Sequence, residues 1–208
     1  MSDATFGQAA HALTLIGQKR PSMASLAALY SSGLFSDILE VEDATAVDRE
    51  AVRALLGLSP LRFEFEVDYE QPFEAMVAAG RYDWRNDNLN EKNFPIKGKG
   101  KKRFEGKLFP ANCSSQEGVD RIATEDKARP WKPGETEHVL MFGATFPELQ
   151  RKTPIVGLGS SARVYGYRSV PCLYVSDRGR SLDLGWWGGD WPDGWRLLGV
   201  REISGPAA

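Results

Sequence analysis

The sequence predicts an α+β protein in which a helical N-terminal segment, residues 1–60, precedes an α+β domain, residues 61–208. Three observations lead to this fold class. Apolar residues repeat with helical spacing up to residue 60, alternate with charged residues in LRFEFEVDY, and form short runs between Gly, Pro, Ser and Asp after Lys152. A chain of 208 residues suits one domain of ordinary size with a small helical addition.

The N-terminal segment is expected to contain three short helices. Ser22 can cap the first, and Gly33 is placed to end it. LFSDILEV, residues 34–41, follows as a second helix or turn, and VDREAVRALLGL, residues 47–58, as a third. Because helices of this length are marginal in isolation, we expect them to pack against other parts of a protein.

The first half of the main domain mixes strands and helices. Residues 61–69 are the clearest strand, with one buried and one solvated face. Pro72 is expected to begin a helix that Gly80 ends, and residues 81–103 are polar and turn-rich, which predicts a long loop. FEGKLF, residues 104–109, returns as a strand.

Two further helical stretches precede the last third of the chain. Ser115 is expected to cap the first of them. The second is TEHVLMFGATFPELQR, residues 136–151, with interruptions predicted at Gly143 and Pro147.

The chain after Lys152 is predicted to be rich in short strands joined as hairpins and a meander, without crossover units. The expected strands are PIVGLG, RVYGYR, PCLYV, SLDLGWW and WRLLGVREI. In SLDLGWW, alternation places Leu182, Leu184 and Trp186 on the core face. It turns Trp187 to the opposite face.

The stretch GWWGGDWPDGW, residues 185–195, holds four of the six tryptophans. It is interpreted as two strand ends and the loop between them. Some of its tryptophans would anchor the loop inside, while small polar residues are displayed outward, as on a recognition surface. The alternative is a domain core closed by aromatic side chains.

Composition excludes several classes of protein. The 26 basic residues are balanced by 28 acidic ones, which argues against a dedicated nucleic-acid binder. No apolar run reaches the roughly 18 residues that span a bilayer. Asp3 and His11 interrupt the first twenty residues where a signal peptide would be basic and then apolar, so a cytoplasmic location is expected. The two cysteines are expected to be reduced thiols.

Candidate cofactor and catalytic motifs are weak. GLGSSA, residues 157–162, has the glycine pattern of a dinucleotide-binding turn, but no helix is predicted after it, so a tight turn between strands is expected. His138 could act as a base for Cys113 or Cys172, yet nothing near either cysteine lowers a thiol pKa. No cofactor, metal ligand or catalytic residue is therefore predicted.

Two charged segments are candidate sites. KGKGKKR, residues 97–103, could grip phosphates, but its glycines and the absence of aromatic residues favour a solvated, mobile loop. Glu66 and Asp68 stand near Glu70, Glu74 and Asp83, and are expected to occupy the solvated face of a strand rather than a catalytic site.

The last third of the chain carries a family resemblance. HVLMFGATFPELQRKTPIVGLGSSARVYGYRSVPCLYVSDRGRSLDLGWWGGDWPDGWRLLGVRE, from residue 138, resembles the C-terminal part of a group of uncharacterised bacterial proteins. These share an FG…PE-Q-R…PIV-LGS core and an RFL-VR-like last strand. VDY…AAGRYDW…NFP, residues 67–95, is similar as well. The organisation resembles the variable proteins diversified by diversity-generating retroelements.

The resemblance implies a C-type-lectin-like fold of the formylglycine-generating-enzyme-like kind over residues 61–208, with a variable ligand-binding region at about residues 160–202. Two motifs depart from the lectin-fold pattern. LGSSA, residues 158–162, stands in place of a GGSW turn and lacks its tryptophan, and GVR, residues 199–201, stands in place of GFR.

The resemblance also implies which residues are displayed. Adenine mutagenesis of AAY codons cannot produce tryptophan, so Trp186, Trp187, Trp191 and Trp195 would be fixed supports. Strand alternation still turns Trp187 outward, and it joins the candidate ligand-binding set. The other members are small, polar or tyrosine residues: Tyr165, Tyr167, Arg168, Ser169, Cys172, Tyr174, Ser176, Asp177, Arg178, Asp183, Gly188, Asp190 and Asp193.

The expected function is ligand binding rather than catalysis. The partner is an unidentified ligand, with a protein as the first expectation, and the oligomeric state is open. Two alternatives stay open: an enzyme on the same fold that uses Cys113 or Cys172 as a reactive thiol, and a module that contacts nucleic acid through residues 97–103.

Overall fold

The computed structural model describes residues 14, 22–40 and 62–203. The chain divides into two units, Met1–Leu56 and Gly57–Ala208, and each is described by itself. In the first unit, α2 (Met23–Ser31) and α3 (Leu34–Leu39) meet at Gly33, whose φ of 77° lies in the left-handed region. This confirms that the first predicted helix ends there, because glycine adopts this backbone without steric cost. The third predicted helix, residues 47–58, lies outside the described residues.

The second unit is built on one mixed sheet whose main path runs β1-β3-β11-β6-β8-β9-β2, with β5 paired to β11 and β7 to β8. Pairings are antiparallel except β11 with β6 and β2 with β9. A separate antiparallel pair joins β10 and β4. The strands are β1 (Arg62–Asp68), β2 (Trp84–Arg85), β3 (Lys101–Pro110), β4 (Cys113–Ser114), β5 (Lys132–Pro133), β6 (Ile155–Val156), β7 (Ala162–Val164), β8 (Tyr167–Ser176), β9 (Gly179–Trp186), β10 (Asp190–Trp191) and β11 (Arg196–Glu202).

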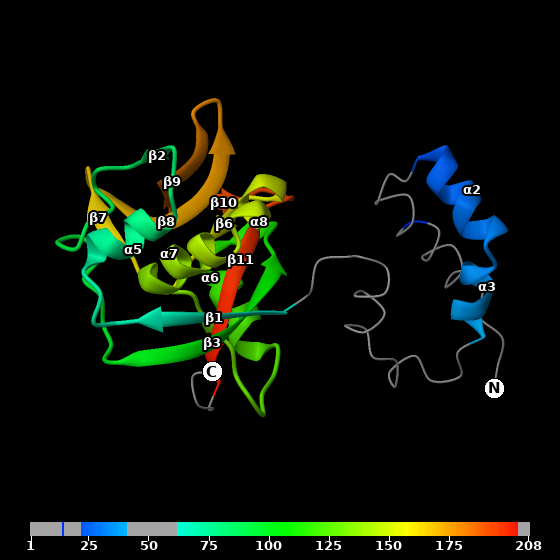
Figure 1. Ribbon diagram of the computed structural model, residues 1–208, viewed down its shortest axis with the longest axis horizontal. Coiled ribbons are helices and arrows are strands. Elements are labelled where there is room, and N and C mark those ends of the chain that lie inside the picture. Colours follow the sequence, from blue (N-terminus) through cyan, green and yellow to red (C-terminus); the bar gives the residue numbers. More distant parts are fainter. Residues whose placement is uncertain (1–13, 15–21, 41–61, 204–208) are drawn as a thin grey trace. The chain divides into compact units, whose positions relative to one another are not determined.

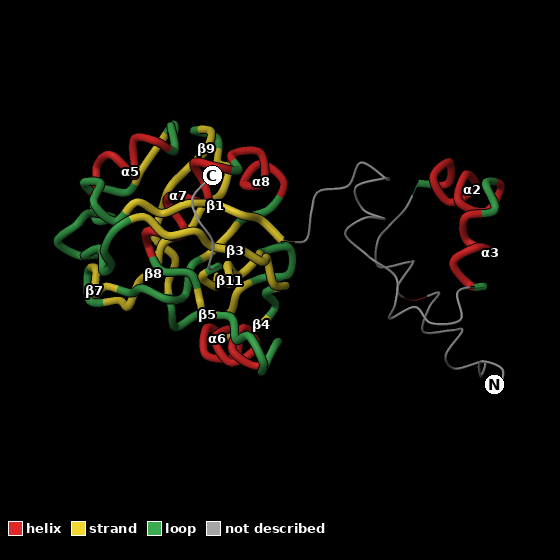
Figure 2. The backbone as a smooth tube through the Cα atoms, turned by 60° about the horizontal axis from the view of Figure 1, so that its bottom comes forward, coloured by secondary structure: helices red, strands yellow, loops and turns green. Residues whose placement is uncertain are grey.

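Four helices cover the two faces of this sheet. Figure 2 shows α6 (Ser115–Thr124) on one side, and α5 (Phe73–Ala79), α7 (Thr136–Thr145) and α8 (Pro147–Lys152) on the other. The second unit is therefore α+β, as predicted. The two parallel pairings correct the expectation of a simple meander.

The core lies in two clusters, one on each face of the central strand β11. Phe63, Phe65 and Phe142 form edge-to-face contacts in the cluster beneath α7. The other cluster packs Ile122 of α6 against Leu197 of β11. Residues 197–201 are buried throughout, because both faces of β11 are covered. Alternate residues of WRLLGVREI in β11 therefore enter two different clusters of the core. In β1, by contrast, alternate residues face the core and the solvent, as expected.

Helix boundaries follow local chemistry. Ser114, one residue before the predicted cap, forms a capping box with Glu117 at the start of α6. Gly143 does not interrupt α7, contrary to expectation. It lies where a Cβ would come within 2.3 Å of the Tyr82 hydroxyl oxygen, so its role is close packing inside a continuous helix. The break falls at Phe146, and Pro147 then begins α8.

The predicted loop of residues 81–103 is shorter than expected, because it contains β2 and ends where β3 begins at Lys101. The backbone N–H groups of Asp83 and Asn86 donate to carbonyls of Arg180 and Leu182, which docks this segment along β9. No helix in the described ranges is long and apolar enough to cross a membrane. A cytoplasmic location stays a prediction.

GLGSSA connects β6 to β7, as the tight-turn interpretation predicts, and no helix follows it. Its glycines let the loop approach the segment that precedes α7. The Gly159 N–H donates to the Gly134 carbonyl at 2.8 Å. A Cβ on Gly159 would lie 2.4 Å from the Pro133 carbonyl oxygen and 2.9 Å from the backbone nitrogen of Glu135. The glycine of this loop thus permits close approach to protein backbone, and not to the pyrophosphate of a dinucleotide.

We expect Gly159→Ala to lower the free energy of unfolding by about 1–3 kcal/mol, because the methyl group would force two backbone segments apart. Urea unfolding followed by tryptophan fluorescence measures the change. Arg163→Ala, on the exposed surface of β7, is the control and should stay within about 0.5 kcal/mol of the wild type. Equal stability of the two variants would contradict this packing role.

Candidate functional site

Three large aromatic side chains are exposed at one end of the β7–β8–β9 sheet. Tyr165 is 85% exposed, Tyr167 61% and Trp186 57%. Tyr165 and Gly166 form the β7–β8 turn with φ values of 50° and 86°, the left-handed conformation that a tight hairpin turn requires. The rings of Tyr167 and Trp186 meet edge to face, with centroids 6.2 Å apart. The cross-strand pair Ser169–Trp186 places these two rings on neighbouring strands.

Arg168 lies beside these rings and is held in place. Its guanidinium carbon is 3.6 Å from the centroid of the Trp187 ring, a close cation–π contact. Its Nε donates to the hydroxyl of Ser161 at 3.0 Å. Arg168 is itself exposed, so its charge is ordered and still open to a partner. We call Tyr165, Tyr167, Arg168 and Trp186 the aromatic surface.

The predicted orientations of Trp186 and Trp187 are wrong. Trp186, expected in the core, is exposed, and Trp187, expected to face outward, is half-buried against the cluster beneath α6. Strand β9 ends at Trp186, so strict alternation stops there. The Trp187 carbonyl accepts a hydrogen bond from the Ser115 hydroxyl at 2.7 Å, which fixes it at the start of α6.

The deeper tryptophans of this stretch act as anchors. The Trp191 ring is buried, and its Nε1 donates to the hydroxyl of Ser115 at 2.9 Å. Its ring centroid lies 5.2 Å from that of half-buried Trp195. Some tryptophans therefore anchor the loop inside, as expected.

The predicted ligand-binding residues do not share one environment. Eight are exposed: Tyr165, Tyr167, Arg168, Asp177, Arg178, Gly188, Asp190 and Asp193. Half-buried members are Tyr174, Ser176, Asp183 and Trp187, and the buried ones are Ser169 and Cys172. The prediction that Ser169 and Cys172 are displayed to a ligand is wrong, because β8 is covered on both faces at those positions.

The exposed members also separate along the β8–β9 hairpin. Asp177 and Arg178 form the turn between β8 and β9, at the far end from the aromatic surface. The ten residues of β8 span about 30 Å, so one small ligand could not contact both ends. Tyr174 and Asp183 serve the fold: the tyrosine hydroxyl donates to the Asp183 carboxylate at 2.7 Å, and this bond raises the pKa of Tyr174.

The cysteines do not form a nucleophile–base pair with His138. Both thiols are buried, and burial raises the pKa of each. The ring nitrogens of His138 contact Tyr69 and the backbone of Glu135 instead. Nothing in this geometry supports a reactive thiol.

We expect Cys113 and Cys172 to react with Ellman's reagent at pH 8 on the order of 100-fold or more slowly in the native protein than in denaturant. Raised pKa values keep both thiols protonated at this pH, and burial blocks access. Stopped-flow absorbance measures the rates, with Cys172→Ala assigning them. If one thiol per chain reacted rapidly in the native state, the result would support the enzyme alternative.

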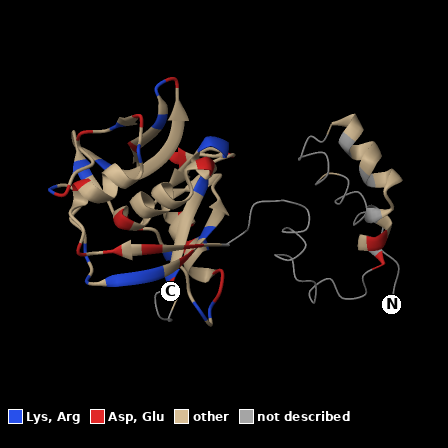
Figure 3. Cartoon of the chain, viewed as in Figure 1, with Lys and Arg blue, Asp and Glu red and all other residues tan. Residues whose placement is uncertain are grey.

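The basic segment 97–103 differs from the predicted mobile loop, because Lys101, Lys102 and Arg103 belong to β3. Figure 3 shows the acidic positions of β1 beside this basic stretch. Lys101 lies near the carboxylates of Glu66 and Asp68, which are half-buried, and Arg103 pairs with Glu64 at 2.6 Å. These cations are paired within the sheet, which disfavours a phosphate-binding role.

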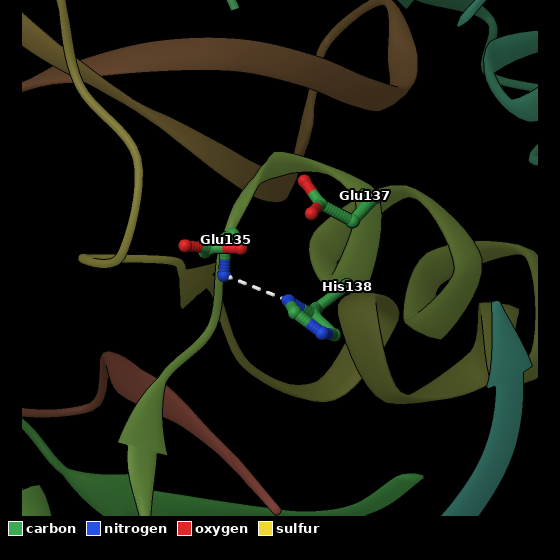
Figure 4. Close-up of side chains that lie close together, drawn as sticks. All are labelled: Glu135, Glu137 and His138. Carbon is green, nitrogen blue, oxygen red and sulfur yellow. Dashed lines mark hydrogen bonds between the residues drawn. The ribbon is translucent and has the colours of Figure 1, made fainter. Parts of the chain in front are cut away.

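A cluster of titratable groups lies at the start of α7, where Glu135, Glu137 and His138 place ligand-type atoms within 4.8 Å of one another. Figure 4 shows the His138 ring turned to the backbone of Glu135, whose N–H donates to Nδ1 at 3.1 Å. Burial lowers the pKa of His138 to about 3. Burial, and secondarily Glu135, raises the pKa of Glu137 to about 7.

The carboxylates of this cluster were not predicted as a site. In the sequence, His138 is a candidate only together with the cysteines, and the acidic candidates lie at positions 66–83. The signal in the sequence is the run E-T-E-H directly after Pro133 and Gly134, which places two acids and a histidine around one helix start.

Comparisons with protein-family models, with curated proteins and with solved structures found no match to this chain. The resemblance to retroelement variable proteins therefore stays a prediction from the sequence. The fold itself is established as mixed α+β, mostly sheet with a few helices.

Proposed function

We propose that this chain is a ligand-binding protein that recognises a protein partner through the aromatic surface. The observation that carries the proposal is the exposure of Tyr165, Tyr167 and Trp186 at one end of the sheet, beside an ordered Arg168. Tyr, Trp and Arg are the residues in which the binding energy of protein interfaces concentrates.

The arrangement limits the entropy lost on binding. The Tyr165–Gly166 turn has a fixed left-handed backbone, and Arg168 is held between Trp187 and Ser161. Aromatic side chains have only two rotatable bonds, so they supply much contact area for little lost freedom. A surface ordered before the partner arrives binds more tightly than one that must be ordered by it.

The proposal extends to diversification by a retroelement and to a C-type-lectin-like form of the α+β fold. Support comes from the two tryptophan anchors, Trp191 and Trp195, and from the exposure of Gly188, Asp190 and Asp193 beside them in the chain. Trp186 is then a fixed anchor that happens to be exposed, since its codon cannot arise by adenine mutagenesis. Ser169 and Cys172 are not among the diversified contacts, because they are buried.

The gene neighbourhood tests the diversification. We expect a reverse transcriptase gene nearby and a template repeat that matches codons 160–202 except at adenines. A complete locus without such a repeat would contradict diversification and leave the binding proposal standing.

Selection from a random peptide library tests the binding itself. The probe is a phage-displayed library panned on the immobilised full chain, with counter-selection on the Tyr167→Ala/Trp186→Ala variant. We expect the wild type to enrich peptide sequences that the variant does not bind. Failure to enrich any such sequence over repeated rounds counts against a peptide-recognising aromatic surface.

A further inference from the structure

One carboxylate oxygen of Glu137 at the start of α7 lacks a hydrogen-bond partner. The residue is 1% exposed, and its Oε1 atom has no hydrogen-bond partner in the described part of the chain. A buried carboxylate oxygen without a donor is costly, and native proteins rarely leave one unless another group satisfies it. This oxygen therefore needs a donor or a cation that the surrounding side chains do not supply.

A second carboxylate shares this position. Glu135, two residues earlier, brings a carboxylate oxygen within 4.8 Å of one from Glu137. Two negative charges at this separation oppose each other in a partly buried site, unless a cation lies between them. Burial together with Glu135 already weakens the acidity of Glu137.

A polar pocket of about 240 Å³ opens beside both carboxylates. Its lining includes Glu135, Glu137, Asn93, Ser160 and Ser161, which together offer carboxylate, amide and hydroxyl oxygens. The two serine hydroxyls already accept one hydrogen bond each, from the Thr136 N–H and from Arg168 Nε, and keep one lone pair for a further partner. A water molecule occupies roughly 30 Å³ in the liquid, so the pocket has room for an ion with several bound waters.

His138 is not available as a metal ligand. Its Nδ1 accepts a hydrogen bond from the Glu135 N–H, so the neutral ring carries its proton on Nε2, which faces the Tyr69 hydroxyl at 3.4 Å. No ring nitrogen lone pair is left for a metal. The remaining donors are oxygens, which hard cations prefer over zinc or copper.

We propose that Glu135 and Glu137, with the pocket oxygens of Asn93, Ser160 and Ser161, form a binding site for one Ca²⁺ ion at the start of α7. Ca²⁺ fits better than Mg²⁺ because it accepts six to eight oxygens in flexible geometry, whereas Mg²⁺ requires a near-ideal octahedron. With two charged ligands and bound water, the expected Kd is on the order of 10⁻⁴–10⁻³ M.

Lys97 provides a control that acts in the opposite direction. Its side chain lines the same pocket, and its charge favours the ionised form of Glu137. Among the described residues, Lys97 has no carboxylate within ion-pair distance, so it partly neutralises the site without closing it. Lys97→Met removes this competing charge and should tighten Ca²⁺ binding several-fold.

The experiment uses the full chain, treated with chelator and titrated with CaCl₂ at pH 8. The thermal unfolding midpoint and isothermal titration calorimetry report binding, with NaCl at matched ionic strength as the salt control. We expect a saturable rise in midpoint and about one ion per chain. Binding should weaken about tenfold or more in Glu135→Gln and in Glu137→Gln, and stay unchanged in Glu148→Gln, whose carboxylate lies on α8.

Three results would overturn the site. The first is no midpoint shift beyond the NaCl control at about 10 mM Ca²⁺, well above the expected Kd. The second is Ca²⁺ binding that both glutamine variants at the site retain. The third is tighter binding of Zn²⁺ than of Ca²⁺ that is lost in His138→Gln, which would make the histidine a ligand.

Discussion

Replacing Tyr167 and Trp186 together by alanine will weaken binding of a library-selected peptide by about 10²–10⁴-fold, if each ring contributes the roughly 2–4 kcal/mol of an interface anchor and the two are partly coupled. Both rings are more than half exposed and contact each other edge to face. Their loss removes little core packing, so the free energy of unfolding should change by less than about 1 kcal/mol. Biolayer interferometry with the immobilised peptide measures Kd, and urea unfolding measures stability.

Two variants make this result specific. Tyr30→Ala removes another exposed aromatic, 53% exposed, from the first unit and should leave Kd unchanged. Tyr167→Phe keeps the ring without the hydroxyl and should retain most of the affinity. Unchanged affinity in the double alanine variant would show that the aromatic surface is not the binding surface. A similar loss in Tyr30→Ala would point to non-specific adhesion.

Arg201→Met will lower the free energy of unfolding by about 3–5 kcal/mol, because it leaves a buried carboxylate without its cation. Arg201 is 7% exposed, and its Nε donates to Glu105 at 2.6 Å. Its Nη1 also donates to Asp126 at 3.1 Å, and its guanidinium carbon lies 4.2 Å from the centroid of the Trp131 ring. The methionine fills a similar volume, so lost charge pairing dominates the effect. Urea unfolding followed by fluorescence measures it.

A double variant distinguishes two contributions to stability: the cost of a buried Glu105 carboxylate that has lost Arg201, and the net stabilisation by the Arg201–Glu105 ion pair. Arg201→Met/Glu105→Leu removes both charges and should recover much of the loss, since a buried ion pair and an apolar pair of similar size differ little in stability. Arg151→Ala breaks the exposed pair with Glu148 and should cost at most about 0.5 kcal/mol. A loss below about 1 kcal/mol in Arg201→Met would mean that Glu105 finds water or another donor.

Local patterns predicted several elements well. The alternation around Phe63 and Phe65 identified β1 and its buried face, and Pro72 and Gly80 bracket α5. These features depend on residues close in sequence, through strand period, fixed proline geometry and helix capping. Predictions failed where the structure of a segment depends on another segment that is distant in sequence. Lys101–Arg103 became part of a strand because β1 pairs with its backbone and adds complementary charges, and no local pattern in the basic segment contains that partner.

The candidate sites divide in the same way. The sequence alone identified the tryptophan-rich stretch as a loop with internal anchors, because composition and turn residues are local properties. Tertiary structure decided that Trp186 is exposed and Trp187 half-buried, since β9 ends at Trp186 and Ser115 at the start of α6 holds the Trp187 carbonyl. It also decided that Glu137 is buried beside an oxygen-lined pocket. Burial and charge pairing depend on which distant segments pack together, and a residue's own neighbours in sequence do not determine that.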